Sequence, residues 1–528
     1  MPFLQRMRFS AAGRLRQMSR VLSRTICPRV LGTQASQVRV FRYSTKAYEN
    51  HDAMDIRPFQ EIPGPKGLPW IGSIHDYILK GGFSKLHLLR QSYFKRYGPI
   101  YKDHLMGTTT VNISDPEEIT KVIRNEGKYP ERPFHFDAII KHREKTTQPQ
   151  GVVYAEGQEW LRLRTAFGKK MLRPKELAKH VVGFSDVAND AMQSIKGARD
   201  GKMEVEELEL QLQKYTIESI GTLVYGFRVG IYDSPPRKES KEVLDAVRIF
   251  FPNLFKQVTS FDRILTRFYE PASYKAMCES HDNFMKHSDT FLRESIERSR
   301  GSKKEADDNE VVTFVEHLAS EGLSMKEINL AAIDMFVAGV DTTATTLQWL
   351  VYNIARHPEV QERLYDEITS VVDACGNLSA KSLGRIPYTR ACLKESMRFS
   401  PPAAAHLRRL KEDTVLNGFQ VPKGTIVQLS LYPNAFDDKL FKNPTEFKPE
   451  RWFRDTGDKI NPFSFKPFGM GKRSCLGKQV AEMEIFVFVC KLMQKFKLEY
   501  NNDEQISGVL KLIMAPDRPV NITFIERT

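Results

Sequence analysis

The chain has 528 residues, of which 41% are hydrophobic, and its composition does not change sharply after residue 66, so one large domain is expected. The formal net charge is +14, but residues 1–48 hold nine Arg, one Lys and no acidic residue, which leaves only +4 for the remainder. So small a charge over so long a stretch argues against a nucleic-acid partner.

The first 48 residues form a basic leader that is rich in Arg and Ser, and the first acidic residue is Glu49. This composition is typical of a mitochondrial transit peptide, with processing expected near residues 39–44. A disordered basic tail or an RNA-binding arm is the alternative. No run of about 18 apolar residues occurs in the chain, so we expect neither a transmembrane helix nor a secretory signal.

Residues 49–66 are interpreted as a spacer that ends in a proline-rich hinge, and residues 67–528 as the single domain. Early in this domain the pattern predicts a helix that ends near the turn Tyr97-Gly98-Pro99. Short strands follow, one of them over residues 108–113.

Gly157 opens a predicted helix in which Trp160 and Arg164 lie four residues apart, on one face. An indole N–H and a guanidinium that point the same way can clamp a carboxylate. A Trp that merely packs under an Arg stem is the alternative.

Residues 181–300 are predicted to be mostly helical, and residues 301–308 to be a polar surface linker. The middle of the helical region mixes apolar and basic side chains, which suits a surface resting in a membrane interface; core packing is the alternative. The mixed stretch contains Ile249, Phe250, Phe251, Leu254, Phe255, Lys256, Phe261, Arg263, Ile264, Leu265 and Arg267.

A capping box at Ser324–Glu327 opens an apolar pattern without proline up to Pro358, which predicts a helix about 50 Å long. Inside it, residues 338–343 read Ala-Gly-Val-Asp-Thr-Thr, and neither Gly nor Thr favours a helix interior. We interpret Gly339 as room for a flat ligand, and Asp341 with Thr342 as a route for water and protons. A kink kept only for packing is the alternative.

The next helix is predicted to begin at Pro387 and to end before Pro401. Glu395 and Arg398 share one face of it, and a pair at this spacing is usually a solvated surface pair. Arg390 and Lys394 project together from the same helix, and we expect both to face solvent. Residues 416–419, Leu-Asn-Gly-Phe, then predict a β-hairpin.

Residues 468–477 read Phe-Gly-Met-Gly-Lys-Arg-Ser-Cys-Leu-Gly and place Cys475 between glycines. The glycines allow tight turns and close approach to a flat cofactor, so this frame suits a metal-binding thiolate better than a core cysteine. A lone structural cysteine in a Gly-rich turn is the alternative. The other cysteines show no metal-ligand or disulfide spacing, and we expect them to be reduced, small hydrophobic residues: Cys27, Cys278, Cys375, Cys392 and Cys490.

The stretch matches Phe-x-x-Gly-x-Arg-x-Cys-x-Gly through Phe468, Gly471, Arg473, Cys475 and Gly477. In these residues the chain resembles the haem-ligand loop of the cytochrome P450 family. The resemblance extends from about residue 60 to the C-terminus, with the motifs in the family's order. It implies a mainly α fold with a smaller β portion, in which a long central helix lies over haem b ligated by the Cys475 thiolate.

Further roles follow from the resemblance, residue by residue. Trp160 and Arg164 would hold one haem propionate, Arg408 the second, and Arg473 would also meet a propionate. Other contacts to the cofactor would come from Phe468, Gly471, Gly477, Ala338 and Gly339. Thr342 and Asp341 would order proton delivery during oxygen activation.

The resemblance also separates structural residues from pocket residues. Glu395, Arg398 and Arg451, the last from Pro449-Glu450-Arg451, would form a buried structural triad. Residues 403–407 with Ile513 and Met514 would line the substrate pocket, and His406 is interpreted as a pocket or rim residue rather than an iron ligand.

In mitochondrial members of the family, a basic pair at the position of Arg390 and Lys394 docks an acidic 2Fe–2S ferredoxin of the adrenodoxin type, which an NADPH-dependent reductase reduces. Lys472 and Lys478 would extend this patch, although Lys478 is followed by Gln479 where members often carry two arginines. An ordinary solvated helix face is the alternative.

Taken as a whole, the resemblance implies a monooxygenase bound peripherally to the matrix side of the mitochondrial inner membrane. It would insert one oxygen atom of O2 into a lipophilic substrate, a steroid, sterol or secosteroid, with xenobiotics as a lesser use. One alternative is a haem-thiolate isomerase or dehydratase, against which the pair Asp341-Thr342 argues. A non-enzymatic haem sensor or carrier is the other.

Overall fold

The computed structural model describes residues 56–527, apart from 69–71, 106, 134–135, 172, 261, 267, 303–311 and 457–458. The predicted leader therefore lies outside the described residues, as do Phe261 and Arg267 of the mixed apolar and basic stretch. The described part is mainly helical with a smaller strand portion, which confirms the predicted fold class.

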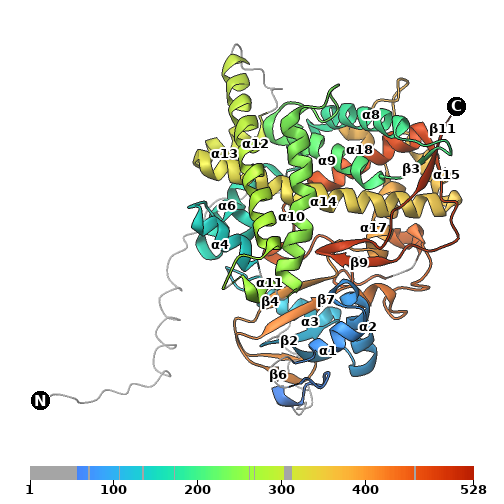
Figure 1. Cartoon of the computed structure of the whole chain (residues 1–528). Helices are drawn as coiled ribbons and strands as arrows, with labels where there is room; N and C mark the ends of the chain where they lie inside the picture. Colours follow the sequence, from blue (N-terminus) through green and yellow to red (C-terminus); the bar gives the residue numbers. More distant parts are fainter. Residues whose placement is uncertain are drawn as a thin grey trace, which may run out of the picture. The chain divides into compact units, whose positions relative to one another are not determined.

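The helices fall into three groups along the chain, and Figure 1 labels most of them. The first group is α1 (Ile74–Leu79), α2 (Leu86–Tyr97), α3 (Pro116–Arg124), α4 (Asp137–Lys145) and α5 (Gly151–Tyr154). The second is α6 (Gly157–Met171), α7 (Pro174–Ala178), α8 (Val181–Gly197), α9 (Leu208–Tyr225), α10 (Lys238–Thr259), α11 (Asp262–Leu265), α12 (Ala272–Ser302) and α13 (Phe314–Ser320). The third is α14 (Met325–Arg356), α15 (Pro358–Thr369), α16 (Ala380–Leu383), α17 (Pro387–Phe399) and α18 (Lys478–Lys495).

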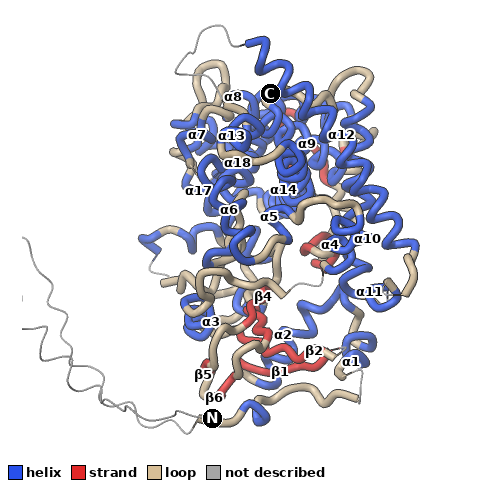
Figure 2. The backbone as a smooth tube through the Cα atoms, turned by 90° about the vertical axis from the view of Figure 1, so that its left-hand side faces the viewer, coloured by secondary structure: helices blue, strands red, loops and turns tan. Residues whose placement is uncertain are grey.

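The strands form four small sheets, and two of them, β1-β2-β7-β4 and β5-β6, lie at one end of the helical part (Figure 2). The largest has the order β1-β2-β7-β4, where β2 and β7 are parallel and the other neighbours antiparallel. The other sheets have the orders β3-β11-β8, β10-β9 and β5-β6. The bounds are β1 (Ile100–Leu105), β2 (Thr108–Ile113), β3 (Glu204–Val205), β4 (Ala405–Arg409), β5 (Thr414–Leu416), β6 (Phe419–Val421), β7 (Ile426–Ser430), β8 (Phe496–Glu499), β9 (Gly508–Lys511), β10 (Ile513–Pro516) and β11 (Ile522–Glu526).

Helix α14 crosses the helical part of the fold, and its start is the predicted one (Figure 1). The Ser324 hydroxyl accepts from the Glu327 N–H, and the Glu327 carboxylate accepts from the Ser324 N–H at 2.8 Å, so the capping box forms. Among the described residues, α14 is the one helix that is long and apolar enough, by length and composition, to suit a membrane span. In the fold, 72% of its most apolar window is buried, because it packs against α9, α12 and α17.

The mixed stretch of α10 mostly supplies core residues, which is the packing alternative rather than the membrane one. Phe250, Phe251 and Leu254 are buried, whereas Ile249 is 46% exposed. Apolar exposure is greater just after α11, where Phe268 is 83% exposed. Helix α12 also continues to Ser302, so the predicted linker at 301–308 begins inside a helix.

Two local predictions about turns and the spacer have clear outcomes. The hairpin of β5 and β6 forms, with Asn417 and Gly418 both at positive φ, as a tight two-residue turn requires. The C-terminal part of the predicted spacer packs on the domain, because Ile62 is buried and the Lys102 N–H donates to the Pro63 carbonyl at 2.8 Å.

Candidate functional site

Cys475 lies between a short 3-10 turn (Gly471–Arg473) and the N-terminus of α18, where Gly477 is the N-cap residue. The Cys475 N–H donates to the Phe468 carbonyl at 2.8 Å, which closes the loop. Its side chain is accessible. The sequence therefore places one sulfur at the start of a long helix, where the helix dipole favours negative charge.

The protein raises the pKa of the Cys475 thiol overall, because desolvation outweighs several effects that lower it. Desolvation by the surrounding protein raises the pKa of the thiol, even though the side chain is accessible. The N–H groups of Gly477 and Lys478 and the charges of Arg164 and Arg132 lower it. These groups stabilise a thiolate, which is the form that binds a metal.

Gly471 holds the loop close to a buried carboxylate that the sequence analysis missed. Its φ is +69°, and a Cβ there would lie 2.4 Å from Oε1 of Glu126. Glu126 accepts from the Lys472 N–H at 2.5 Å and from Nε of Arg408 at 3.0 Å, while Nη2 of Arg408 donates to the Met470 carbonyl at 2.8 Å. One carboxylate thus ties β4 to the cysteine loop, and no local sequence signal marked it.

Trp160 and Arg164 share a face of α6, as predicted, and both lie near the cysteine loop. The Arg164 guanidinium is 5.7 Å from the centre of the Trp160 ring, and Nη2 of Arg164 reaches Ser474 Oγ at 3.4 Å. Trp160 is only 1% exposed, yet its indole N–H has no hydrogen-bond partner. A buried donor in this condition is suited to an additional acceptor.

Arg473 bonds mainly to protein atoms. Its Nε donates to the Pro130 carbonyl at 2.9 Å, Nη1 and Nη2 to the Ala155 carbonyl at 3.2 Å, and Nη2 to Glu156 at 2.6 Å. Arg473 therefore has few N–H groups left for the predicted contact with a carboxylate ligand. Most of its bonds go to Ala155 and Glu156, in the loop before α6.

Arg132 is a further cation at the site that the sequence analysis missed. Its Nε is buried without a hydrogen-bond partner. Burial and the like charges of Arg473, Arg408 and Arg164 lower its pKa to about 10, and Glu156 opposes this effect. A signal was present, because residues 130–132 repeat the Pro-Glu-Arg found at 449–451.

The donors around Cys475 fit a flat cofactor that carries two carboxylates. Trp160 Nε1, Arg132 Nε and His406 Nε2 are all buried without partners. Burial lowers the pKa of His406 to about 4, so its ring is neutral at physiological pH, and its Cε1 lies 3.4 Å from where a Cβ on Gly469 would be. The cluster holds more arginines than carboxylates and would accept further anionic groups.

Residues 338–343 of α14, where small and polar residues interrupt the apolar face, form an interrupted segment. Its structure differs from the prediction at Gly339. A Cβ on Gly339 would lie 2.5 Å from Cδ1 of Ile220, so the space made by this glycine is filled by α9 and not by a ligand. Ala338, one residue earlier, is exposed where α14 is otherwise buried or half-buried, and the Thr342 hydroxyl donates to its carbonyl at 2.6 Å. Ala338 and Thr342 are therefore the residues of this segment that face open space.

Asp341 turns toward α9 instead of toward Thr342. Its Oδ1 accepts from Nε2 of Gln213 at 3.1 Å. Burial, reinforced by the charge of Glu209, raises the pKa of Asp341 to about 6, although the Gln213 hydrogen bond and Lys511 oppose the shift. A carboxyl group with this pKa exchanges protons near neutral pH.

Glu395 brings α17 together with the segment Pro449–Trp452. The carboxylate is 0% exposed and pairs with Arg398 at 2.8 Å and Arg451 at 2.9 Å. It also accepts from Nε1 of Trp452 at 2.9 Å and from the Lys448 N–H at 2.9 Å. A pair that looked like an ordinary surface pair in the sequence is thus fully buried and hydrogen-bonded.

The basic pair on α17 is less uniform than predicted. Lys394 is exposed, whereas Arg390 is half-buried. Nη2 of Arg390 donates to the Leu383 carbonyl at 2.7 Å, and its guanidinium lies 4.6 Å from the centre of the Phe486 ring. The expectation that both side chains face solvent therefore holds for Lys394 only, because Arg390 is engaged with neighbouring elements.

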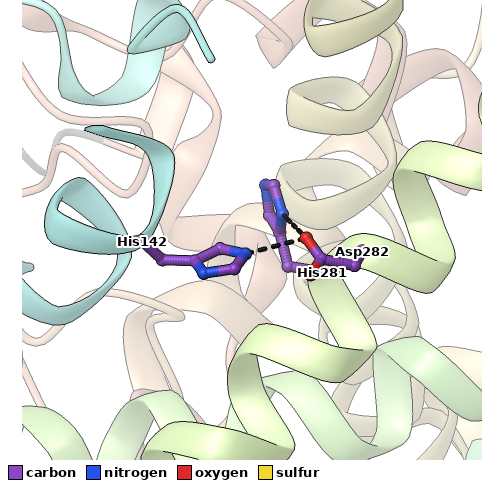
Figure 3. A group of neighbouring side chains, drawn as sticks. All are labelled: His142, His281 and Asp282. Atoms are coloured by element: carbon purple, nitrogen blue, oxygen red, sulfur yellow. Dashed lines mark hydrogen bonds and ion pairs between the residues drawn. The ribbon is translucent and has the colours of Figure 1, made fainter. Parts of the chain in front are cut away.

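A second polar group, His142, His281 and Asp282, joins α4 to α12 away from Cys475 (Figure 3). Oδ1 of Asp282 lies 2.7 Å from Nε2 of His142 and 3.5 Å from Nδ1 of His281. Nε of Arg143 donates to Nε2 of His281 at 3.3 Å, so the ring proton is on Nδ1, the nitrogen that faces Asp282. The group is therefore better described as a hydrogen-bonded link between helices than as a cation site.

The remaining cysteines in the described residues show one departure from expectation. Cys278, Cys392 and Cys490 are buried, as expected of small hydrophobic residues. Cys375 is exposed in the turn after α15. Cys27 lies outside the described residues.

Comparisons with known proteins agree with this arrangement. The family model described as "Cytochrome P450" matches residues 62–524. Cytochrome P450 10 of Lymnaea stagnalis is 32% identical over 499 residues, which cover 93% of this chain and 90% of the relative. The mitochondrial 1,25-dihydroxyvitamin D(3) 24-hydroxylase of Mus musculus is 30% identical over 90% of both chains.

A third relative, the mitochondrial 25-hydroxyvitamin D-1 alpha hydroxylase of Rattus norvegicus, is 28% identical over 89% of this chain and 95% of its own. The family model matches almost the whole described region. Within that region, the site has one accessible cysteine at a helix N-terminus and buried hydrogen-bond donors without partners. The chain therefore belongs to the cytochrome P450 family, and it is a haem-dependent monooxygenase.

Proposed function

We propose that this protein is a mitochondrial monooxygenase that hydroxylates a steroid, sterol or secosteroid with electrons from a 2Fe–2S ferredoxin. The observation that carries the proposal is the site itself, in which Cys475 is accessible at the start of α18 among unpartnered donors. Two relatives whose names specify a mitochondrial hydroxylase of a vitamin D secosteroid support the compartment and the substrate class.

In this proposal Cys475 ligates the haem iron, and the propionates bind to Trp160, Arg164 and Arg132. Arg408 contributes less directly, because Glu126 and the Met470 carbonyl already engage it. Phe468, Gly471, Gly477, Ala338 and Gly339 shape the two faces of the cofactor space, Gly339 by letting Ile220 pack closely rather than by touching the haem. Bound haem supplies oxygen activation and oxidation of an unactivated C–H bond.

Asp341 and Thr342 supply protons in this proposal, and they do so from different directions. Asp341 exchanges protons near neutral pH because burial raises its pKa to about 6. The Thr342 hydroxyl lies toward the open side of α14 and gives up its bond to the Ala338 carbonyl when it orients a proton donor.

Thr342→Ala should leave haem and substrate binding near normal and divert electrons into peroxide. An unchanged ratio of product to electrons consumed would remove Thr342 from the mechanism.

The substrate pocket is proposed where β10 meets the residues before β4. The Met514 N–H donates to the Pro402 carbonyl at 3.1 Å, and Nε1 of Trp349 donates to the Met514 carbonyl at 3.0 Å. These bonds fix β10 beside residues 403–407 and against α14. The two stretches expected to line the pocket thus lie together, which supports their shared role.

The test of this function is a reconstitution with a 2Fe–2S ferredoxin and its NADPH-dependent reductase. The ferrous carbon monoxide complex should show the strongly red-shifted Soret band of thiolate ligation, and a secosteroid panel should shift the Soret band of the resting protein. Ferredoxin-dependent O2 uptake with hydroxylated product supports the proposal. Rearranged product without O2 uptake would indicate an isomerase or dehydratase, and ligand binding without turnover a sensor or carrier.

Ferredoxin docking is proposed at a basic patch on the side of the protein that carries the cysteine loop. The patch is formed by Lys394, Lys472 and Lys478, and the half-buried Arg390 supports it. Opposite charges mainly raise the association rate, so their effect fades with salt.

Replacing Arg390 and Lys394 by Gln should raise the ferredoxin concentration for half-maximal turnover at least about tenfold. Lys394→Gln alone isolates the exposed charge, and Lys238→Gln, 83% exposed on α10, is the matched control. Salt-sensitive ferredoxin kinetics unaltered by the double change would move the site elsewhere.

The compartment and the membrane contact are separate parts of the proposal. Removing residues 1–48 should leave ligand binding intact and prevent import, and a truncated protein found in the matrix would contradict the leader assignment. Peripheral membrane contact is proposed at Ile78 and Leu79 of α1 with Phe268 and Tyr269 after α11, four large side chains that are 55 to 83% exposed. Leu79→Asp with Phe268→Asp should release the protein from phosphatidylcholine vesicles that contain an anionic phospholipid.

A further inference from the structure

We propose that one face of α9, formed by Gln213, Thr216 and Ile220, positions residues 339–341 of α14, and that Gln213 is the positioning residue for the Asp341 carboxyl group. This inference rests on the proposed proton-supplying role of Asp341. It assigns to α9 a specific part in the reaction, through one buried amide.

The three side chains lie at i, i+3 and i+7, on one face of α9. Each meets a different residue of the interrupted segment. Nε2 of Gln213 donates to Asp341, the Thr216 hydroxyl reaches the Val340 carbonyl at 3.3 Å, and Ile220 fills the space beside Gly339. Three successive residues of α14 are therefore each held by a separate contact from the same helix.

Gln213 has a chemical feature that packing alone does not require. It is 3% exposed, and its Oε1 is buried without a hydrogen-bond partner. An amide can donate to an ionised carboxylate, and after rotation it can accept from a protonated one. The Gln213 side chain can therefore remain bonded to Asp341 in both protonation states, which an apolar residue could not do.

The charges that face Asp341 come from two elements. Glu209 on α9 opposes its ionisation, and Lys511 on β9 favours it. Glu209 and Lys511 are exposed, whereas Gln213 is buried. Gln213 thus makes the direct contact to the carboxyl group, and the two charged side chains act over a longer distance.

Gln211 offers an internal comparison on the same helix. It is also buried, at 7% exposed, but its Oε1 accepts from the Ser194 hydroxyl of α8 at 2.7 Å. Its amide thus joins two helices away from α14. The same substitution at both positions separates a loss of stability from a change at Asp341.

The test compares Gln213→Leu with Gln211→Leu in the haem-loaded protein. The protonated carboxyl band of Asp341, identified in difference infrared spectra by its loss in Asp341→Asn, is titrated with pH in each variant. We expect Gln213→Leu to raise the midpoint by roughly one pH unit, since it removes a bond that favours the ionised form. Gln211→Leu should leave the midpoint unchanged. Gln213→Glu, which keeps the shape and adds a like charge, should raise it further and serves if the Leu variant does not fold.

Turnover gives the second measurement. Gln213→Leu should lower the yield of product per electron at least about threefold. It should cause no further loss in an Asp341→Asn background, because residues that act through one group are not additive. An unshifted midpoint in both Gln213 variants, or a loss that adds fully to that of Asp341→Asn, would overturn the inference. Neither result touches the carbon monoxide spectrum or ferredoxin-dependent O2 uptake, so the proposed function is judged separately.

Discussion

The two sides of the site are built by different interactions. On the side of the cysteine loop and α17, buried carboxylates bind arginines from distant segments, as Glu126 does with Arg408 and Glu395 with Arg451. On the α14 side, residues 339–341 are held by packing against Ile220 of α9 and by neutral side-chain bonds from Gln213 and Thr216.

Because of this difference, we expect the side with buried ion pairs to be rigid and the α14 side to be adjustable. Removing one partner of a buried ion pair leaves an uncompensated charge, so the loop around Cys475 has few alternative arrangements. A helix segment that is held by one amide, one hydroxyl and the packing of one methyl group can change a proton position without breaking a network of ion pairs. The proposed metal ligand, Cys475, is therefore held rigidly, whereas the proposed proton donor, Asp341, remains adjustable.

The largest effect is expected at the cysteine itself. Cys475→Ser should abolish the strongly red-shifted Soret band of the ferrous carbonyl complex, because no other described cysteine combines accessibility with a helix N-terminus. The matched control is Cys375→Ser, which removes the other exposed thiol among the described residues and should leave the spectrum unchanged. If the Cys475→Ser variant retained the band, the assignment of Cys475 as the iron ligand would be wrong.

The rigid side can be broken at Glu395. Glu395→Gln should destabilise the fold by about 3–5 kcal/mol, since two buried arginines lose their common counter-charge. Glu450→Gln is the control in the adjacent segment, where the carboxylate is 33% exposed and pairs with Arg363, and it should cost under about 1 kcal/mol. Denaturant midpoints measure both, and equal losses would contradict the proposed contrast between the two carboxylates.

The adjustable side should reveal itself in the pH dependence of stability. The folded pKa of Asp341, about 6, lies above its ordinary value of 3.8, so the ionised group destabilises the fold above about pH 6. Asp341→Asn should therefore stabilise the protein at pH 8, by at most about 3 kcal/mol. This gain should shrink as the pH falls from 6 toward 4. Thermal unfolding at pH 8 and pH 5 tests this, and an advantage that does not depend on pH would contradict it.

A smaller effect is expected at Gly471, on the rigid side. Gly471→Ala must adopt φ +69° and displace Glu126, so it should cost roughly 1–2 kcal/mol more than Gly322→Ala. Gly322 has a similar φ, +80°, but nothing lies within 4 Å of its missing Cβ. Denaturant unfolding of the two variants isolates the contribution of the close carboxylate, and equal costs would show that Glu126 moves away freely.

The sequence by itself determined the features that depend on local chemistry. The Ser324 capping box set the start of α14, the Asn417-Gly418 pair set the hairpin, and Pro387 set the start of α17. The loop around Cys475 was found in the same way, because its glycines and its cysteine are adjacent in the chain. Signals of this kind are carried by a few neighbouring residues, whatever the rest of the molecule does.

Only the tertiary structure decided which side chains meet across long stretches of chain. Glu126 gave no local signal, and the Pro-Glu-Arg at 130–132 did not show where Arg132 would lie. Both lie among the arginines near Cys475 because β4, α6 and the cysteine loop converge there. Gly339 looked like room for a ligand, but Ile220 of α9 fills that room. Likewise, Arg390 is half-buried because Phe486 of α18 lies beside its guanidinium. In each case burial and pairing depend on a partner far away in the sequence, and local patterns do not contain that information.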